Sequence, residues 1–276
     1  MLTVLIPCKN ERLNIRACIE SVRGIADEIL IADSGSTDGT LDIVRSLGGC
    51  RIIEREYVNS ANFKNWAIPQ ATHEWVLVVD ADERVSPELA AEIRLVLSSP
   101  PKHDAYRLRR DNFFLGHPIR YCDWNTPELT RLFRRDLGRY QERRVHADVE
   151  IVGGTIGDLT GKLLHYTAWD LADFVAKQNR YSTWAAEDMH DKGKRHGLVV
   201  ALLRFPIRFL YLYVLRLGFL DGMAGLVVCS IMAHYAFLKS AKLWALHDTI
   251  GHPDGAPAKS SRRHSSEPAT TRRHAA

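Results

Sequence analysis

The stretch "WVLVVDADERVSPEL", which runs from Trp75 to Leu89, decides the fold class. It begins with five apolar residues, and a run that is apolar on both faces predicts a strand buried inside a parallel sheet. A Ser-Pro pair near its end predicts the start of a helix. Between them lie three acids, either solvated loop charges or ligands for a divalent cation: Asp80, Asp82 and Glu83.

Three more apolar runs precede this stretch, at Leu2–Ile6, Glu28–Ala32 and Arg51–Ile53, and apolar residues recur at helical spacing between them. This alternation predicts βαβ units, so residues 1–98 are expected to form a doubly wound, mostly parallel α/β sheet. Ligands of such sheets bind beyond the carboxyl ends of the strands. Aromatic and Arg-rich segments from about 105 to 165 predict a mixed-sheet extension, and the rest is expected to be helical.

The composition indicates a folded protein of a reducing compartment. A chain of 276 residues with 46% hydrophobic content can bury a sizeable core. Its five cysteines include no CxxC pair, so neither a disulfide framework nor a zinc site is expected. The first apolar stretch is too short for a signal peptide, which predicts that the catalytic part stays in the cytosol.

Positive charge is concentrated at the end of the chain. The net charge is +4, and residues 251–276 hold five Lys or Arg against two acids, which accounts for +3. The same residues contain almost no large apolar side chain, so they are expected to form a disordered basic tail. Because the body is nearly neutral and lacks a recognised DNA or RNA module, no nucleic-acid partner is expected.

Two polar clusters follow buried strands. Asp80 and Asp82 are two positions apart, so an extended backbone would aim both at one cation such as Mg²⁺ or Mn²⁺; a solvated loop is the alternative. In "DSGSTDGT" (33–40), glycines permit tight turns and Asp33 can accept from a ribose or a base; a capped turn is the alternative. The chain has no GxGxxG and no GxxxxGK[ST], which argues against dinucleotide and Walker-type sites.

Four motifs in order resemble the successive signatures of family 2 glycosyltransferases. They are "VLIPCKNE" (4–11), "EILIADSGSTDGT" (28–40), "KNWA" (64–67) and "VLVVDADE" (76–83). The resemblance covers roughly residues 1–190. It implies a GT-A fold and a nucleotide-sugar donor.

Later segments are similar to a subgroup that includes lipopolysaccharide core β-1,4-glucosyltransferases. These are "WNTPELTRLFRR" (124–135), "RRVH" (143–146), "GKLLHY" (161–166) and "NRYSTWAAEDM" (179–189). The narrower similarity implies transfer of a hexose, expected to be glucose, from a UDP-sugar.

The resemblance implies a metal site and a donor site. Asp80 and Asp82 would hold Mg²⁺ or Mn²⁺ against the diphosphate, with Asp82 as the direct ligand, and Glu83 is left as a loop or helix-approach charge. His165 is either a further metal or phosphate contact or a satisfied histidine at a strand end. The implied substrate-binding residues are Pro7, Lys9, Asn10, Glu11, Asp33, Ser34, Gly35, Lys64, Asn65, Asp80 and Ala81.

An inverting transferase needs a carboxylate to take the proton of the acceptor hydroxyl. The subgroup usually shows "VHE", but this chain has Ala147 at the position of the acid. The nearest catalytic candidates are Asp148 and Glu150, beside His146. Three readings stay open: Asp148 is the base, an acid from elsewhere is the base, or transfer is weak.

The Arg-rich residues 107–110, with Arg131, Arg134 and Arg135, are either a solvated face or a contact for an anionic acceptor such as a phosphorylated sugar-lipid. Farther along, residues 198–220 are apolar and aromatic with three arginines, and residues 222–238 carry no formal charge. We expect peripheral attachment to a membrane through 198–246; a true span or a core or dimer helix pair are the alternatives.

Together these features predict a metal-dependent inverting glycosyltransferase at the cytosolic face of a bacterial inner membrane. Residues 1–190 would form the GT-A domain, 191–250 the membrane-associating helices and 251–276 the tail. The expected acceptor is a lipid-linked saccharide, namely lipopolysaccharide core, and a homo-oligomer is possible. The alternatives are a polyprenyl-phosphate glycosyltransferase and a weakly active membrane scaffold that retains the nucleotide-sugar pocket.

Overall fold

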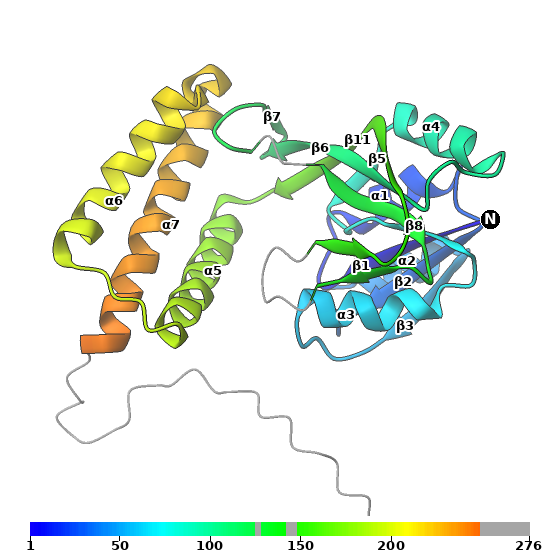
Figure 1. The fold of residues 1–276 in the computed structure, drawn as a ribbon, viewed down its shortest axis with the longest axis horizontal. Coiled ribbons are helices and arrows are strands. Elements are labelled where there is room, and N and C mark those ends of the chain that lie inside the picture. Colours follow the sequence, from blue (N-terminus) through cyan, green and yellow to red (C-terminus); the bar gives the residue numbers. More distant parts are fainter. Residues whose placement is uncertain (125–127, 142–147, 249–276) are drawn as a thin grey trace, which may run out of the picture.

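The computed structural model describes residues 1–124, 128–141 and 148–248, and within them nine strands form one sheet (Figure 1). Its order is β3-β2-β1-β4-β8-β6-β11-β5, with β7 paired to β6. The strands are β1 (Leu2–Cys8), β2 (Glu28–Asp33), β3 (Cys50–Glu54), β4 (Trp75–Val78), β5 (Glu83–Val85), β6 (Ala105–Phe114), β7 (His117–Ile119), β8 (Leu129–Arg134) and β11 (Ile156–Ala168). A separate antiparallel pair joins β9 (Gly138–Tyr140) to β10 (Val149–Ile151).

The four apolar runs of the sequence form the parallel half of the sheet, as predicted. β1 pairs in parallel with β2 on one side and β4 on the other. The mixed extension begins where β8 pairs antiparallel to β4. The sheet was therefore predictable in class, while the short strand β5 was not predicted because its three residues follow directly on the acidic turn.

Helices cover both faces of the parallel half, which confirms the doubly wound arrangement. One face packs on α1 (Ile15–Val22), α2 (Thr40–Leu47) and α4 (Pro87–Leu97), and the other on α3 (Ser60–Ala67) and the 3₁₀ turn Ile68–Gln70. α4 begins where predicted, with the Ser86 hydroxyl accepting from the backbone N–H of Leu89 at 3.2 Å.

Three long helices form a second layer beside the sheet (Figure 1). They are α5 (Leu171–Asp191), α6 (Leu198–Leu210) and α7 (Gly222–Asp248), with a π-helical turn at Tyr211–Leu215 and a 3₁₀ turn at Gly218–Asp221. α7 packs against both α5 and α6. Lys242 Nζ on α7 donates to the Ser182 and Thr183 hydroxyls of α5, both at 2.8 Å, which fixes that pair.

The helical layer contacts the sheet beside β7. The Asp221 carboxylate accepts from the backbone N–H groups of Arg120 and Tyr121, which follow β7. An apolar cluster around Phe114, Phe174 and Val228 lies beneath them. These contacts hold the N-terminal part of α5 near the carboxyl edge of the sheet.

Among the described residues, one helical segment, Gly218–His247, is long and apolar enough to cross a membrane, judged by length and composition alone. Pro206 lies inside α6 without ending it, although proline removes a backbone donor from a helix. The predicted boundaries at 190 and 250 stay predictions, and the predicted tail 251–276 lies outside the described residues.

Candidate functional site

Two adjoining cavities lie at the carboxyl edge of the parallel strands. The strand-edge cavity, about 440 Å³, is lined mainly by residues that follow β1, β2 and β4. The helix-edge cavity, about 510 Å³, lies between the loop after β1 and the first turns of α5. Glu11, Asp82 and Lys177 line both, so the two cavities meet at these three side chains.

The strand-edge cavity collects residues from all four sequence motifs, although they are far apart in the chain. This is the convergence that the sheet predicts, because parallel strands end at one edge. The predicted residues that line it are Pro7, Lys9, Glu11, Ser34, Lys64, Asp80, Ala81, Asp82 and His165.

The remaining predicted donor residues lie around it. Asn10 lines the helix-edge cavity. The Asp33 carboxylate is buried and accepts from the N–H groups of Gly35 and Ser36, both at 2.8 Å, so it shapes the loop in which Gly35 has a positive φ. Asn65 exchanges two hydrogen bonds of 2.8 Å with the backbone of Tyr140 and thereby fastens α3 to β9.

Asp80 is held by two buried cations. Lys64 Nζ lies 2.7 Å from one carboxylate oxygen, and Arg131 Nη2 lies 2.8 Å from the other. Burial by itself raises the pKa of Asp80, but Arg131 and Lys64 outweigh it and hold that pKa far below its usual range. For Lys64, burial lowers the pKa, but the attraction of the Asp80 carboxylate outweighs burial and the pKa of Lys64 is raised. Asp80 is therefore a permanent anion.

Asp80 and Asp82 face different partners. The backbone turns after Asp80, because the N–H of Glu83 donates to the Asp80 carbonyl at 2.8 Å, so the extended backbone considered for the metal pair does not form. Asp82 instead approaches His165 Nε2 at 3.3 Å. Burial raises the pKa of Asp82, but His165 outweighs that effect and lowers it. Both carboxylates still line the strand-edge cavity.

The setting of His165 suits a divalent cation. Asn112 donates its amide nitrogen to the carbonyl of Trp124, so its oxygen faces His165 Nδ1 at 2.7 Å. Nδ1 therefore carries the proton, and in a neutral imidazole Nε2 turns a lone pair toward the Asp82 carboxylate. A lone pair and a carboxylate at 3.3 Å repel each other unless Nε2 carries a second proton or a cation lies between His165 and Asp82.

A metal here would draw on the substrate for part of its coordination. Among the described residues, no three His, Cys, Asp or Glu side chains gather as a metal cluster. Mg²⁺ commonly binds through one or two carboxylates and completes its shell with water and substrate phosphates. Asp82 with His165 fits that pattern, and Asp80 would join them only by exchanging Lys64 or Arg131 for the cation.

Glu83 corrects the prediction of a loop charge. Its side chain is fully buried in β5, where it accepts from the backbone N–H of Asp80 at 2.9 Å and pairs with Arg110 and Arg131, each at 3.4 Å. A solvated-loop charge was expected because acids after a strand usually face water. Arg131 was expected either on a solvated face or at an anionic acceptor, and that prediction is also wrong. Its side chain is buried beneath the cavity, where it pairs with Asp80 and Glu83.

The other arginines of the basic segment already have partners. Arg107 pairs with Asp158 at 2.7 Å and Arg109 with Glu128 at 3.0 Å. Arg134 pairs with the Glu74 carboxylate at 2.9 Å, and the Arg135 guanidinium donates to the carbonyl of Ala71 at 2.5 Å. The basic composition of this segment therefore reflects surface and buried pairing within the sheet extension.

Glu11 lies at the junction of the two cavities. Its carboxylate accepts from the Asn14 amide at 2.9 Å. Burial, followed by the nearby Asp82 charge, raises the pKa of Glu11 to about 7. The group therefore exchanges its proton near neutral pH, as a general base must.

The predicted catalytic residues after β9 lie elsewhere. Asp148 and Glu150 are exposed and line neither cavity, and Glu150 accepts from the Gln141 amide at 2.6 Å. His146 and Ala147 lie outside the described residues. The assignment of the base to Asp148 stays a prediction.

Sequence reasoning missed the contribution of α5. Lys177 and Tyr181 line the strand-edge cavity, and Asp170, Asp173 and Lys177 line the other. These positions recur at spacings of three and four, which places them on one helix face. That polar stripe beside the buried Phe174 was the available signal.

The chain belongs to glycosyl transferase family 2, whose model matches residues 3–148, and it has an α/β sheet of the GT-A kind. It is 32% identical over 260 residues to the lipopolysaccharide core biosynthesis glycosyltransferase LpsC of Rhizobium meliloti, covering 92% of this chain and 95% of that protein. It is 29% identical to the uncharacterized glycosyltransferase RP128 of Rickettsia prowazekii, covering 88% and 86%.

Solved structures with similar folds include glycosyltransferases with bound nucleotide sugars. The Pyrobaculum calidifontis mannosyltransferase PcManGT, in complex with GDP-Man and Mn²⁺, matches with a TM-score of 0.47 and 17% identity, covering 92% of this chain and 77% of that one. S. aureus TarS with UDP-GlcNAc matches with a TM-score of 0.47 and 15% identity, covering 92% and 95%.

Proposed function

We propose that this glycosyltransferase moves a hexose, expected to be glucose, from a UDP-sugar to a lipid-linked saccharide of the lipopolysaccharide core. The observation that carries the proposal is the convergence of all four motifs on the strand-edge cavity, which opens at Glu11, Asp82 and Lys177 into a second cavity. Two substrates can thus meet at one junction. Similarity to LpsC over 92% of the chain supports the choice of acceptor pathway.

The charged residues of the site would have three roles in transfer: binding the metal, supplying a positive charge and accepting a proton. Asp82 and His165, with Asp80, would hold Mg²⁺ or Mn²⁺, which when bound stabilises the charge on the departing diphosphate as a Lewis acid. Lys177 adds a positive charge at the junction, where it lowers the pKa of Glu11 in opposition to burial. A carboxylate there takes the proton of the attacking hydroxyl, and Glu11 is placed for this role while Asp148 remains the alternative.

The test is a donor screen with detergent-extracted membrane lipids, purified protein and Mn²⁺, read by mass spectrometry of the product. UDP-glucose should label a core saccharide, and Asp82→Asn should reduce transfer by about a hundredfold or more, given several kcal/mol of metal stabilisation. Asp136→Asn, an exposed acid, is the matched control.

Each alternative has its own outcome. Labelling of polyprenyl phosphate instead of the core would identify the other acceptor. Nucleotide binding without turnover on any lipid would identify the scaffold. Transfer from a different nucleotide sugar would refute the choice of UDP-sugar.

We further propose that α6 lies on the cytosolic leaflet of the inner membrane, within the attachment region 198–246. Its apolar side chains point outward: Val199 is 67% exposed and Leu202 61%. Arg204 and Arg208 turn the other way and contact His196 and Asp123. This is the reverse of a helix that faces water and suits one that enters the lipid interface.

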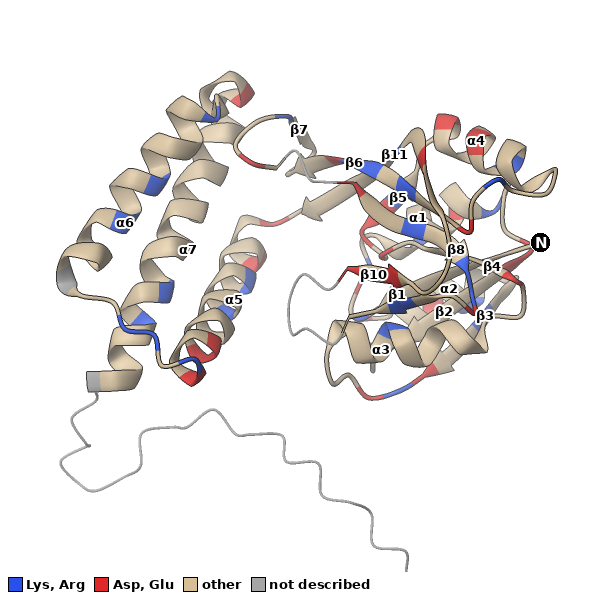
Figure 2. Cartoon of the chain, in the orientation of Figure 1, with Lys and Arg blue, Asp and Glu red and all other residues tan. Residues whose placement is uncertain are grey.

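Neighbouring cations favour an anionic leaflet. Burial lowers the pKa of Lys239 on α7, and the nearby charges of Arg204, Arg208 and Lys194 lower it further. These four basic residues therefore lie close together where α6 packs against α7. In Figure 2 the ribbon is blue, the colour of Lys and Arg, along much of the segment that connects α5 to α6.

Vesicle co-sedimentation tests the attachment. Binding should be stronger to vesicles with anionic lipid than to neutral vesicles, and Leu202→Glu with Ile207→Glu should weaken it at least tenfold. Leu95→Glu, on an exposed position of α4, is the control. If light scattering instead shows a dimer that the double variant abolishes, the exposed face of α6 binds a second copy of the chain and not a membrane.

A further inference from the structure

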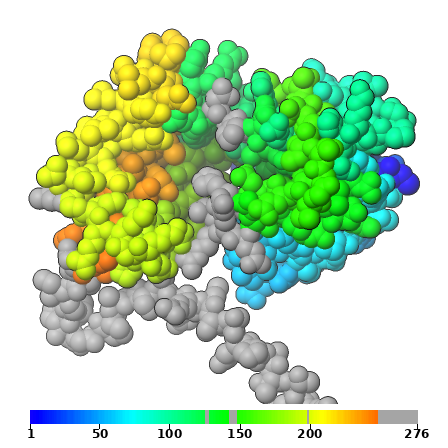
Figure 3. All heavy atoms as spheres, viewed as in Figure 1, coloured from blue at the N-terminus to red at the C-terminus, as the bar shows by residue number. Residues whose placement is uncertain are grey.

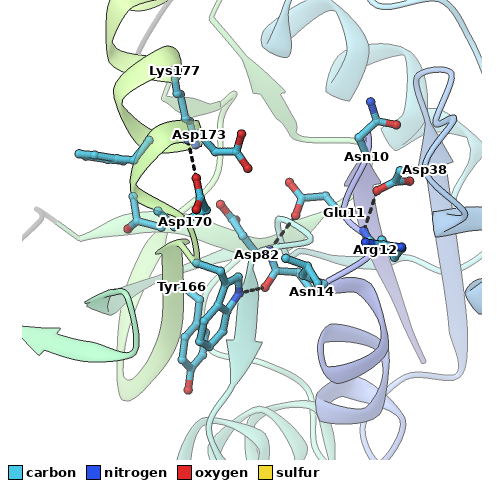
Figure 4. Close-up of a pocket in the computed structure, with 15 residues that line it drawn as sticks. Asn10, Glu11, Arg12, Asn14, Asp38, Asp82, Tyr166, Asp170, Asp173 and Lys177 are labelled. Carbon is cyan, nitrogen blue, oxygen red and sulfur yellow. Dashed lines mark hydrogen bonds between the residues drawn. The ribbon is translucent and has the colours of Figure 1, made fainter.

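The helix-edge cavity has a different character from its neighbour (Figure 4). One wall is the loop after β1 and the other is the end of β11 with the first turns of α5. Glu11, Asp82 and Lys177 close its inner end, where it meets the strand-edge cavity. A molecule in this cavity would meet one in the strand-edge cavity at these three side chains.

Tyr166 and Trp169 line the cavity and belong to a stack of three aromatic rings. Phe113 lies 4.8 Å from Tyr166, and Tyr166 lies 5.2 Å from Trp169, with interplanar angles of 17° and 11°. Trp169 ends the stack and remains 44% exposed. Its indole N–H donates to Asn14 Oδ1 at 2.8 Å, so the ring is held in place before any ligand arrives. An ordered, half-exposed aromatic ring inside a polar cavity is a typical ligand contact.

The charges that line the cavity select against an anion. Its carboxylates are Glu11, Asp38, Asp82, Asp170 and Asp173, while its cations are Arg12 and Lys177. Asp170 caps α5 by accepting from the N–H of Asp173 at 2.9 Å. The Asp173 carboxylate has no hydrogen bond or ion pair to a residue in the described ranges, so it is free to accept from a ligand hydroxyl.

We infer that the helix-edge cavity binds the acceptor as an uncharged sugar ring, stacked on Trp169 and hydrogen-bonded to Asp173. The inference rests on the proposed transferase function and deepens it. In the transfer step, the acceptor hydroxyl oxygen bonds to the anomeric carbon of the donor. The bond from that carbon to the diphosphate breaks, its electron pair leaves with the nucleoside diphosphate, and the hydroxyl proton passes to a carboxylate at the junction.

This inference disfavours one of the two readings of the Arg-rich segment. An anionic acceptor was one reading of the Arg-rich segment, but those arginines are paired within the sheet extension. Any phosphate or carboxylate of the acceptor would therefore lie outside this cavity. The inference therefore predicts that the sugar ring receiving the hexose has no charged group.

The first experiment uses full-length protein, UDP-glucose and soluble acceptor glycosides. Trp169→Ala should raise the acceptor KM tenfold or more, with the donor KM and the slow hydrolysis of the donor by water within twofold of wild type. Trp169→Phe should restore most of the affinity, because it keeps a ring on the stack. Trp244→Ala, at a tryptophan that is 57% exposed on α7, is the matched control and should change neither constant.

A second variant tests the charge argument without disturbing the stack. Wild type should prefer neutral hexosides or heptosides over analogues whose acceptor ring carries a carboxylate or a phosphate. Asp173→Lys, at an exposed position, should reduce or reverse that preference.

The outcomes separate this inference from the proposed function. Unchanged acceptor KM in Trp169→Ala, or wild-type preference for a charged acceptor ring, overturns the inference while donor hydrolysis continues. Wild-type protein that neither transfers to any acceptor nor hydrolyses the donor overturns the function itself.

Discussion

The two adjoining cavities differ in how far their polar side chains are buried and paired. Beneath the strand-edge cavity, the Asp80 carboxylate is held between the buried side chains of Lys64 and Arg131. Around the helix-edge cavity, Asp173 and Trp169 remain exposed. Buried, paired charges hold one geometry, whereas an exposed carboxylate such as Asp173 keeps freedom to meet a ligand. The donor side of the site is therefore fixed by paired charges, and the acceptor side combines an aromatic ring held by Asn14 with the exposed carboxylate of Asp173.

The largest expected effect comes from breaking the buried network. Glu83→Ala leaves Arg131 and Arg110 without one of their counter-charges, so it should lower the free energy of unfolding by about 3–5 kcal/mol. Urea unfolding measures the change, with Glu20→Ala on the exposed face of α1 as the control. A loss below about 1 kcal/mol would show that the two sides of the site do not differ in this way.

The next effect concerns the junction. Burial and the nearby Asp82 charge raise the pKa of Glu11 to about 7 in the metal-free protein, and a cation on Asp82 would lower it. If Glu11 is the base, wild-type kcat/KM should therefore rise with pH at or below about pH 7, as this carboxyl loses its proton. Glu11→Gln should lower kcat/KM by about a hundredfold and remove that rise. A pH profile that Glu11→Gln leaves intact, with the loss found in Asp148→Asn, would return the role to Asp148.

A smaller effect is expected at the amino end of the sheet. Burial raises the pKa of Glu28, but hydrogen bonds from Thr3, Thr72 and Arg51 outweigh it and lower that pKa from 4.5 to about 2. Because the folded state holds the anion more strongly, the stabilisation is present above pH 4.5 and is lost as the pH falls toward 2.

Glu28→Gln should therefore destabilise by about 1–2 kcal/mol at pH 7, a value reduced by solvent screening, and by nearly nothing near pH 2. Unfolding at several pH values measures the difference between the two proteins. An equal difference at both ends of the range would assign the effect to packing.

The smallest effect is expected on the acceptor side. Asp173→Asn should change the free energy of unfolding by no more than about 0.5 kcal/mol, because its carboxylate is exposed and supports no other described residue. The same unfolding assay used for Glu83 measures it. A loss of several kcal/mol would mean that this wall is as rigid as the donor side.

Much of the donor side was predictable from local patterns. Buried apolar runs end in polar clusters, and parallel strands bring those clusters to one edge, so the positions of Lys9, Ser34 and Asp80 at one cavity followed directly. Glu83 was misjudged because a local pattern cannot reveal that β11 pairs beside this acid and that β8 supplies it with Arg131. Its burial depends on strands that lie more than 40 residues away in the chain.

The sequence by itself determined the family, the doubly wound sheet and the residues that meet beyond β1, β2 and β4, because hydrophobic periodicity and turn chemistry are local. Only the tertiary structure decided that Asp80 and Asp82 serve different partners and that α5 supplies a second wall with Trp169 at its base. Those facts depend on where distant segments pack, since pairing and burial are set by neighbours in space.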